Sequence, residues 1–141
     1  MSAASDYLEG QIRAHLLRTA TWTKPTVARV ALATAATTDA QTGATLTEVA
    51  NAGAYARTGP DPLDANWTAA SATDGLSDNA AAIVFPTATA AWGTVTPMMM
   101  VDSATWGAGN SIVHGALVAS KVVGNGDVFQ FAIGALDITT A

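Results

Sequence analysis

The stretch Gly93-Thr-Val-Thr-Pro-Met-Met-Met-Val101 decides how the chain can fold, because it fits an extended strand with two apolar faces. Side chains alternate between the faces of a strand, so Met99 points away from Met98 and Met100. A buried middle strand explains this pattern, and so does a strand at an interface, since methionine adapts to irregular apolar surfaces. Proline cannot donate to a ladder, so Pro97 indicates a sheet edge or a bulge.

Similar short segments surround this strand. From Val27 onward, β-branched and alternating runs are separated by Gly, Asp, Asn and Pro, which is typical of an all-β chain. The turn Gly124-Asn-Gly-Asp127 predicts a hairpin that joins residues 122–123 to residues 128–133. We expect further short strands at residues 27–33, 46–49, 55–57, 67–70, 83–85, 111–117 and 136–139, with 46–49 pairing with 55–57. The predicted fold is a jelly-roll-like β-sandwich over residues 27–140.

One helix precedes the sandwich. Ser5 can cap it, and Asp6 and Glu9 stand in its first turn, at the positive end of the helix dipole. An apolar stripe at four-residue spacing follows, formed by Leu8, Ile12 and Leu16. We therefore predict a mainly β fold with one N-terminal α-helix over about residues 6–18. The whole chain, residues 1–141, forms a single domain, because 141 residues is an ordinary size for one.

Composition and charge exclude several classes of protein. The chain has no cysteine, which removes disulfides and thiolate nucleophiles. Its net charge of −5 is opposite to that of a nucleic-acid-binding surface, so no nucleic acid is expected as a partner. The charge is uneven, at +1 for residues 1–57 and −6 for residues 58–141. No apolar run approaches the ~20 residues that cross a bilayer, so no membrane partner is expected either.

The chain offers no assembled catalytic or metal site. His15 and His114 are the only imidazoles, and the strand position of His114 is typical of a hydrogen-bonded structural residue. The densest acidic group lies within a long excursion at residues 59–79 and consists of Asp61, Asp64, Asp74 and Asp78. Turn-capping explains that group better than a calcium loop. We expect no cofactor, no metal and no enzyme activity, since hydrolysis of a surface polysaccharide would need a pair of catalytic carboxylates.

The excursion and the tryptophans remain candidates for binding. Long loops in compact domains are often functional, and residues 59–79 contain Trp67. Each of the four tryptophans is expected to be a core residue, and any that is exposed would serve as a contact anchor or as a platform for a glycan. The others are Trp22, Trp92 and Trp106.

The order of short segments resembles a family of small bacteriophage virion proteins, often labelled tail-fibre-like, some of which are similar to head decoration or cement subunits. The resemblance extends over nearly the whole chain. It departs from the family in the enlarged excursion and in the triple methionine. The segments that carry it are Tyr7-Leu8-Glu9, Leu16-Leu17-Arg18-Thr19, Val30-Ala31-Leu32, Thr47-Glu48-Val49, Tyr55-Ala56-Arg57, Phe85-Pro86, Trp92-Gly93-Thr94-Val95-Thr96, Asp102-Ser103-Ala104-Thr105 and Gly126-Asp127 before Phe129-Gln130-Phe131.

This resemblance implies a virion protein, assembled in the host cytoplasm. A fibre must span a long distance, whereas a 141-residue sandwich is a knob with a radius of gyration of about 14 Å. We therefore expect a capsid decoration or cement protein that binds the major capsid protein and stabilises the head shell. The alternative is a tail or tail-fibre-associated subunit that contacts an adaptor or the host surface. Either would be a homo-oligomer, with a trimer among the options.

The expected contact residues fall into two groups. Arg13, Arg18 and Lys24 carry much of the basic charge and are predicted to face an acidic partner. A subunit interface is predicted at Met98, Met100 and Trp106.

Overall fold

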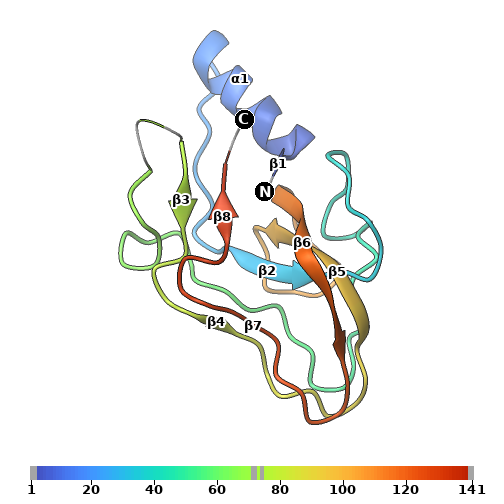
Figure 1. The fold of residues 1–141 in the computed structure, drawn as a ribbon. Coiled ribbons are helices and arrows are strands. Elements are labelled where there is room, and N and C mark those ends of the chain that lie inside the picture. Colours follow the sequence, from blue (N-terminus) through green and yellow to red (C-terminus); the bar gives the residue numbers. More distant parts are fainter. Residues whose placement is uncertain (1–2, 71–72, 74, 140–141) are drawn as a thin grey trace.

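β5 (Gly93–Val101) is an inner strand of a four-stranded antiparallel sheet with the order β1-β6-β5-β2 (Figure 1). The other strands are β1 (Ala3–Ala4), β6 (Ser111–Val123) and β2 (Arg29–Leu32). The structure is a computed structural model that describes residues 3–70, 73 and 75–139, so Asp74 lies outside the described residues. The fold is mainly β with one N-terminal helix, which confirms the predicted fold class.

Two small antiparallel ladders complete the β structure. β3 (Ser77–Asp78) pairs with β8 (Asp137–Ile138), and β4 (Ile83–Val84) pairs with β7 (Gln130–Phe131). The main core lies between one face of the four-stranded sheet and the second ladder with its flanking loops. Its side chains include Val30, Leu32, Val95, Val113, Phe85, Phe129 and Phe131.

The triple methionine follows the predicted alternation. Met98 and Met100 point into the main core and are only 4% and 6% exposed. Met99 is fully buried on the opposite face, in a small cluster beneath Leu46. Both faces of β5 are therefore covered within one chain, which is the buried-strand explanation of the pattern.

Pro97 is accommodated by a bulge and not by an edge. The register between β5 and β6 shifts between Val95 and Pro97, where residues 117–120 of β6 stand opposite Thr96 alone. The carbonyl group of Pro97 is still used, since it accepts a hydrogen bond from the Ala33 amide at 3.1 Å. The Thr96 amide donates to the Ala33 carbonyl at 3.1 Å, so that carbonyl has a donor although Pro97 has no amide hydrogen.

The predicted hairpin at residues 122–133 is wrong, although its turn is present. Gly126 has a φ of 88°, and the Asp127 amide donates to the Gly124 carbonyl at 3.2 Å. Residues 122–123 belong to the end of β6 and pair with β5, whereas β7 pairs with β4. Phe129 explains the difference. Its ring packs edge-on against that of Phe85, with the two ring centroids 5.6 Å apart, and this contact directs the chain toward β4.

The predicted strands within residues 46–70 are also corrected. Residues 46–49 and 55–57 do not pair with each other; Glu48 forms an isolated bridge with Ala33, and Thr58 forms one with Val30. Residues 67–70 contain no strand, and Trp67 forms one bridge with Asn79. The outer edge of β2 is thus covered by irregular chain, which satisfies its backbone groups without another full strand.

A buried ion pair holds this irregular chain in place. The Arg57 guanidinium donates to both carboxylate oxygens of Glu48 at 2.8 Å. It also donates to three carbonyl groups in other loops, those of Gly43, Ser103 and Ala108. The Tyr55 hydroxyl donates to Glu48 at 2.9 Å and accepts from the Leu32 amide at 2.9 Å. These contacts connect the sheet to three loops.

α1 (Asp6–Leu17) begins as predicted and ends one residue earlier than predicted. The Ser5 hydroxyl accepts a hydrogen bond from the Leu8 amide at 3.2 Å, so Ser5 is the N-cap. Leu8 is the only buried residue of the helix, which projects from the end of the β structure (Figure 1). No helix in the described part of the chain is long and apolar enough to cross a membrane.

Candidate interaction surface

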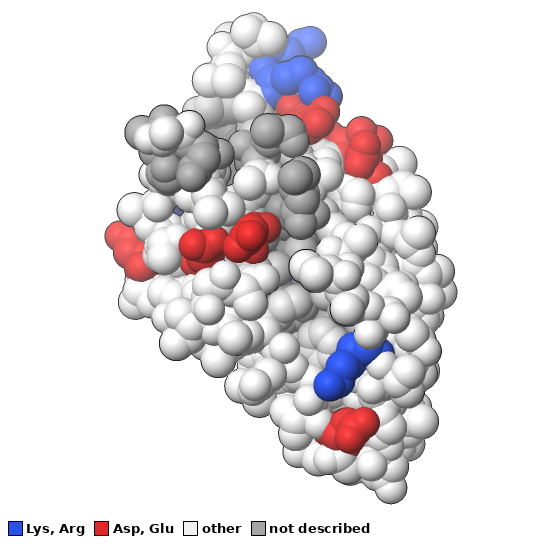
Figure 2. Space-filling view, in the orientation of Figure 1, with Lys and Arg blue, Asp and Glu red and all other residues white. Residues whose placement is uncertain are grey.

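The far end of α1 exposes apolar and basic side chains together. Leu16 and Leu17 are 72% and 80% exposed, and Arg18, the C-cap residue, is exposed beside them. Arg13 lies one turn earlier and forms an ion pair with Glu9 at 2.9 Å. Figure 2 shows basic side chains gathered over this helix, next to acidic ones. The helix therefore projects a small apolar surface with a positive end.

A pocket of about 250 Å³ lies where the segment after α1 crosses the sheet. Its walls include Trp22, Trp67 and Ile112, its lining is almost entirely apolar, and Met100 contributes to it despite being nearly buried. Lys24 also lines this pocket, and its ammonium group donates to the Pro62 carbonyl at 3.3 Å. Lys24 is thus a single positive charge beside an apolar surface.

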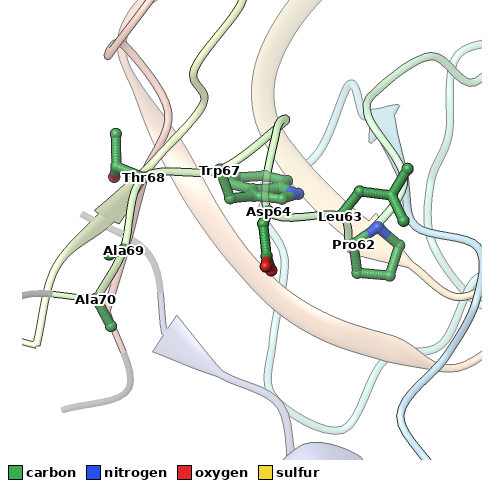
Figure 3. A pocket seen from close by; sticks show the side chains of 7 residues that line it. All are labelled: Pro62, Leu63, Asp64, Trp67, Thr68, Ala69 and Ala70. Carbon is green, nitrogen blue, oxygen red and sulfur yellow. The ribbon is translucent and has the colours of Figure 1, made fainter.

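A second pocket, of about 540 Å³, adjoins the first and shares Pro62 and Trp67 with it. Figure 3 shows its lining side chains, with the Asp64 carboxylate projecting beside the Trp67 indole. The remaining lining residues are Leu63, Thr68, Ala69 and Ala70. This second pocket combines an aromatic wall, small apolar groups and one carboxylate, all from the excursion at residues 59–79.

The four tryptophans divide into two kinds. The indole N–H of Trp92 donates to the Gly53 carbonyl at 2.8 Å, and that of Trp106 donates to the Val49 carbonyl at 2.9 Å. Trp22 and Trp67 are partly exposed, and their indole N–H groups have no hydrogen-bond partner among the described residues. A tryptophan at an interface usually has a partner for its N–H group. Both of these tryptophans line the same apolar pocket.

Asp61 and Asp64 are three residues apart but differ in their contacts. The Arg29 guanidinium donates to both oxygens of Asp61 and holds the pKa of that carboxyl below its ordinary value. Asp64 is exposed and forms no ion pair or hydrogen bond within the described part of the chain. A cationic group of a partner would therefore meet an uncompensated negative charge at Asp64 and not at Asp61.

His114 is a hydrogen-bonded strand residue, as predicted. Its Nε2 atom lies 2.7 Å from an oxygen of Asp39, and its Nδ1 atom lies 2.9 Å from the Thr37 hydroxyl. The Asp39 carbonyl in turn accepts from the Asp6 amide at 3.1 Å. The arrangement fastens the loop at residues 37–39 between α1 and β6. Nowhere in residues 3–70, 73 and 75–139 do three or more side chains form a group that could hold a metal ion.

The predicted contact residues are separated in the structure. Arg13 and Arg18 lie on the projecting helix, whereas Lys24 lies at the apolar pocket. Trp106 is 44% exposed, and its indole N–H donates a hydrogen bond to a loop carbonyl. Met98 and Met100 are buried core residues of this chain, and Met100 also lines the apolar pocket beside Trp22, so their role in a subunit interface stays a prediction. The sequence pattern marks the tryptophans and the excursion as candidates for binding but does not single out Trp22 or Asp64.

The comparison with protein families supplies what the geometry alone does not. Residues 3–139 match the family described as podophage GP4 fiber I protein gp80. The chain belongs to this family. As a member of the fiber I protein family it is a bacteriophage structural protein of the fibre-like kind, and its place is in the virion among other virion proteins. No curated protein matches the chain.

Proposed function

We propose that this chain is a tail-fibre-associated structural subunit of a phage particle. The observation that carries the proposal is the family match, which extends over residues 3–139 and therefore over the core, α1 and both pockets. A fibre subunit of this size acts as a knob that contacts its neighbours through its surface. The projecting helix and the adjoining pockets support such a role, because both are features that a partner can cover.

The expected partners are an adaptor protein of the tail or a component of the host surface. The surface of the chain supports a role in binding, because neither Arg18 at the helix end nor Asp64 at the larger pocket has an ion pair among the described residues. In both cases the chain would act by binding.

A second candidate is capsid decoration, in which the chain would bind the major capsid protein and stabilise the head shell. It is favoured by the short, non-repetitive chain, since a knob of this size can cover joints between shell subunits. The two candidates predict different positions on the same particle, so position distinguishes them.

Labelling of purified virions with a gold-conjugated antibody against this chain tests the proposal. Gold confined to the tail or to the vertex that bears it is the expected result. Gold distributed over the whole head would overturn the fibre-associated role in favour of decoration. Intact particles that carry no gold, when the same antibody detects the chain in disrupted particles, would also contradict a surface position.

We infer further that the chain performs no catalysis. The contacts of Asp61 support this, because its carboxylate is bound by Arg29 and not directed at the pocket that Asp64 lines. A pair of cooperating carboxylates is what polysaccharide hydrolysis requires. Incubation of the purified chain with host surface polysaccharide should leave the polymer length unchanged. Shortening of the polymer that disappears in Asp64→Asn would overturn the inference.

A further inference from the structure

We propose that the end of α1 docks into the pocket formed by Trp22 and Trp67 on a second copy of this chain. Three features support this contact, namely the apolar end of the helix, the apolar pocket and the charges beside each. It concerns association of the chain in solution, so it goes beyond the proposed fibre role and is tested without a particle.

The first feature is the apolar end of the helix. Leu17 is 80% exposed and Leu16 is 72% exposed, although both follow the buried turn that contains Leu8. Single exposed leucines are ordinary on a protein surface, but two adjacent ones at the tip of a projecting helix form a compact anchor. Within one chain this anchor remains uncovered, since neither leucine lines the pocket beside Trp22.

The second feature is an apolar pocket that suits this anchor. The cavity has a volume of about 250 Å³ and an almost entirely apolar lining that includes Trp22, Trp67 and Ile138. It continues into the larger pocket past Pro62. A leucine side chain in the smaller pocket would therefore bring the next residue, Arg18, toward the larger one.

The third feature is charge, and it commits the pocket to a second copy. Arg18 has no ion pair among the described residues, and Asp64 at the larger pocket has none either. Arg18 would lie over the Trp67 indole and against the Asp64 carboxylate, which combines a cation–π contact with an ion pair. Lys24 is the one positive charge that faces the same pocket, and it would meet the negative end of the helix dipole.

The overall charge distribution agrees with this pairing. Residues 1–57, which contain the helix, carry +1, and residues 58–141, which contain Asp64, carry −6. A contact that places Arg18 of one copy beside Asp64 of the other offsets part of the repulsion between two chains that each carry −5. The helix end and the pocket are different surfaces, so copies join either reciprocally about a two-fold axis or head to tail in a ring.

A charge-swap experiment tests the contact. Sedimentation velocity of the wild-type chain, at concentrations up to about 100 µM, should show a finite oligomer. Arg18→Glu alone and Asp64→Arg alone should each weaken association by at least about tenfold, because each places like charges together. The double variant Arg18→Glu/Asp64→Arg restores opposite charges and should recover association close to that of the wild type. Both residues are exposed, so neither substitution threatens the fold.

Two further variants make the result specific. Lys121→Glu changes the net charge by the same amount as Arg18→Glu but lies on β6, outside both pockets, and should leave association unchanged. Leu17→Ser removes the anchor and should weaken association by about tenfold to a hundredfold. Dilution of the wild-type oligomer should shift tryptophan emission to the red as Trp22 and Trp67 meet water.

Several outcomes would overturn the proposal. A wild-type chain that sediments as a monomer throughout the concentration range rejects a second copy as the occupant of the pocket. An oligomer that both single charge reversals leave intact is held together elsewhere. Failure of the double variant to recover, with its circular dichroism unchanged, also rejects the pairing of Arg18 with Asp64. None of these outcomes alters the position of gold on the particle, so the fibre role is judged separately.

Discussion

Arg57 and Glu48 face each other through two hydrogen bonds of 2.8 Å at a point where their side chains are 0% and 1% exposed. Both residues belong to segments by which the sequence resembles its family, and the structure gives those segments a physical role. The guanidinium has all its bonding directions occupied by oxygen atoms, so a buried charge that would otherwise be costly is compensated. This pair positions the loops on one side of the sheet.

Glu48→Gln should destabilise the chain strongly. The substitution leaves the Arg57 charge buried without its counter-charge, and breaking a buried pair in this way costs about 3–5 kcal/mol. Urea unfolding followed by circular dichroism measures the loss. Glu9→Gln is the matched control, because it breaks the exposed pair with Arg13 and should change the free energy of unfolding by less than about 1 kcal/mol. Equal effects of the two substitutions would contradict the assigned role of Glu48.

Tyr55→Phe should cost about 1–3 kcal/mol of stability, because the Leu32 amide loses its acceptor while it stays buried. Burial and the nearby Glu48 charge raise the pKa of the Tyr55 hydroxyl above its ordinary value, so the group remains neutral and able to donate. Thermal unfolding of Tyr55→Phe and of the control Tyr7→Phe measures the difference. A Tyr55→Phe chain as stable as Tyr7→Phe would show that the hydroxyl bridge contributes nothing.

Two glycine-to-alanine substitutions should have opposite effects. A Cβ atom on Gly43 would lie 2.1 Å from the Ala108 carbonyl oxygen, so Gly43→Ala must force apart the loops that Arg57 joins. Gly10 lies within α1 with open space around it, and Gly10→Ala should stabilise the helix by about 0.5–1 kcal/mol. Melting temperatures of the two variants should therefore move in opposite directions from the wild type. A neutral Gly43→Ala would mean that this loop contact is loose.

The Asp61–Arg29 pair should make stability depend on acid pH. Arg29 lowers the pKa of Asp61 in the folded chain, so the unfolded chain takes up the proton first as the pH falls. The stabilisation is complete above the ordinary aspartate pKa of about 3.9 and is lost as the pH falls through the lowered value. Asp61→Asn should be less stable than the wild type at neutral pH, and the gap in urea midpoint should close in acid.

Asp64→Asn provides the comparison for Asp61→Asn. Its carboxylate forms no ion pair within the described part of the chain, so removal of the charge should leave the urea midpoint of the monomer nearly unchanged at neutral pH. If the difference in urea midpoint between Asp61→Asn and the wild type is the same at every pH, the ion pair is not the source of that difference.

Secondary structure is predicted most accurately from the sequence where the local pattern of residues and their burial agree. β5 has the predicted bounds because alternation over nine residues is unambiguous, and Ser5 caps α1 because its side chain acts within one turn. The predicted turn at residues 124–127 is confirmed. Its partner strands are not, since Phe129 packs against Phe85, which is distant in the sequence. The residues of a turn carry no information about a contact with a side chain so distant in the sequence.

The interaction surface is harder to read from the sequence. Arg57 and Glu48 are ordinary charged residues by composition, and only their burial gives them significance. Trp22 and Trp67 differ from Trp92 and Trp106 in whether the indole N–H meets a carbonyl, which depends on loops that no periodicity predicts. The methionines were ambiguous for a related reason, because a strand covered by its own chain and one covered by a neighbour share the same alternation.

The pairing of β1 with β6 has a consequence for how the chain is made. Ala3 and Ala4 pair with His114 and Val113, so the segment that carries α1 reaches its place only after a strand more than 100 residues further along the chain has been synthesised. Pairing across such a separation closes a long loop and is intrinsically slow. Nascent chains therefore carry an undocked α1 on the ribosome. Synthesis of residues 113–114 sets the earliest moment at which the helix is presented in its final position.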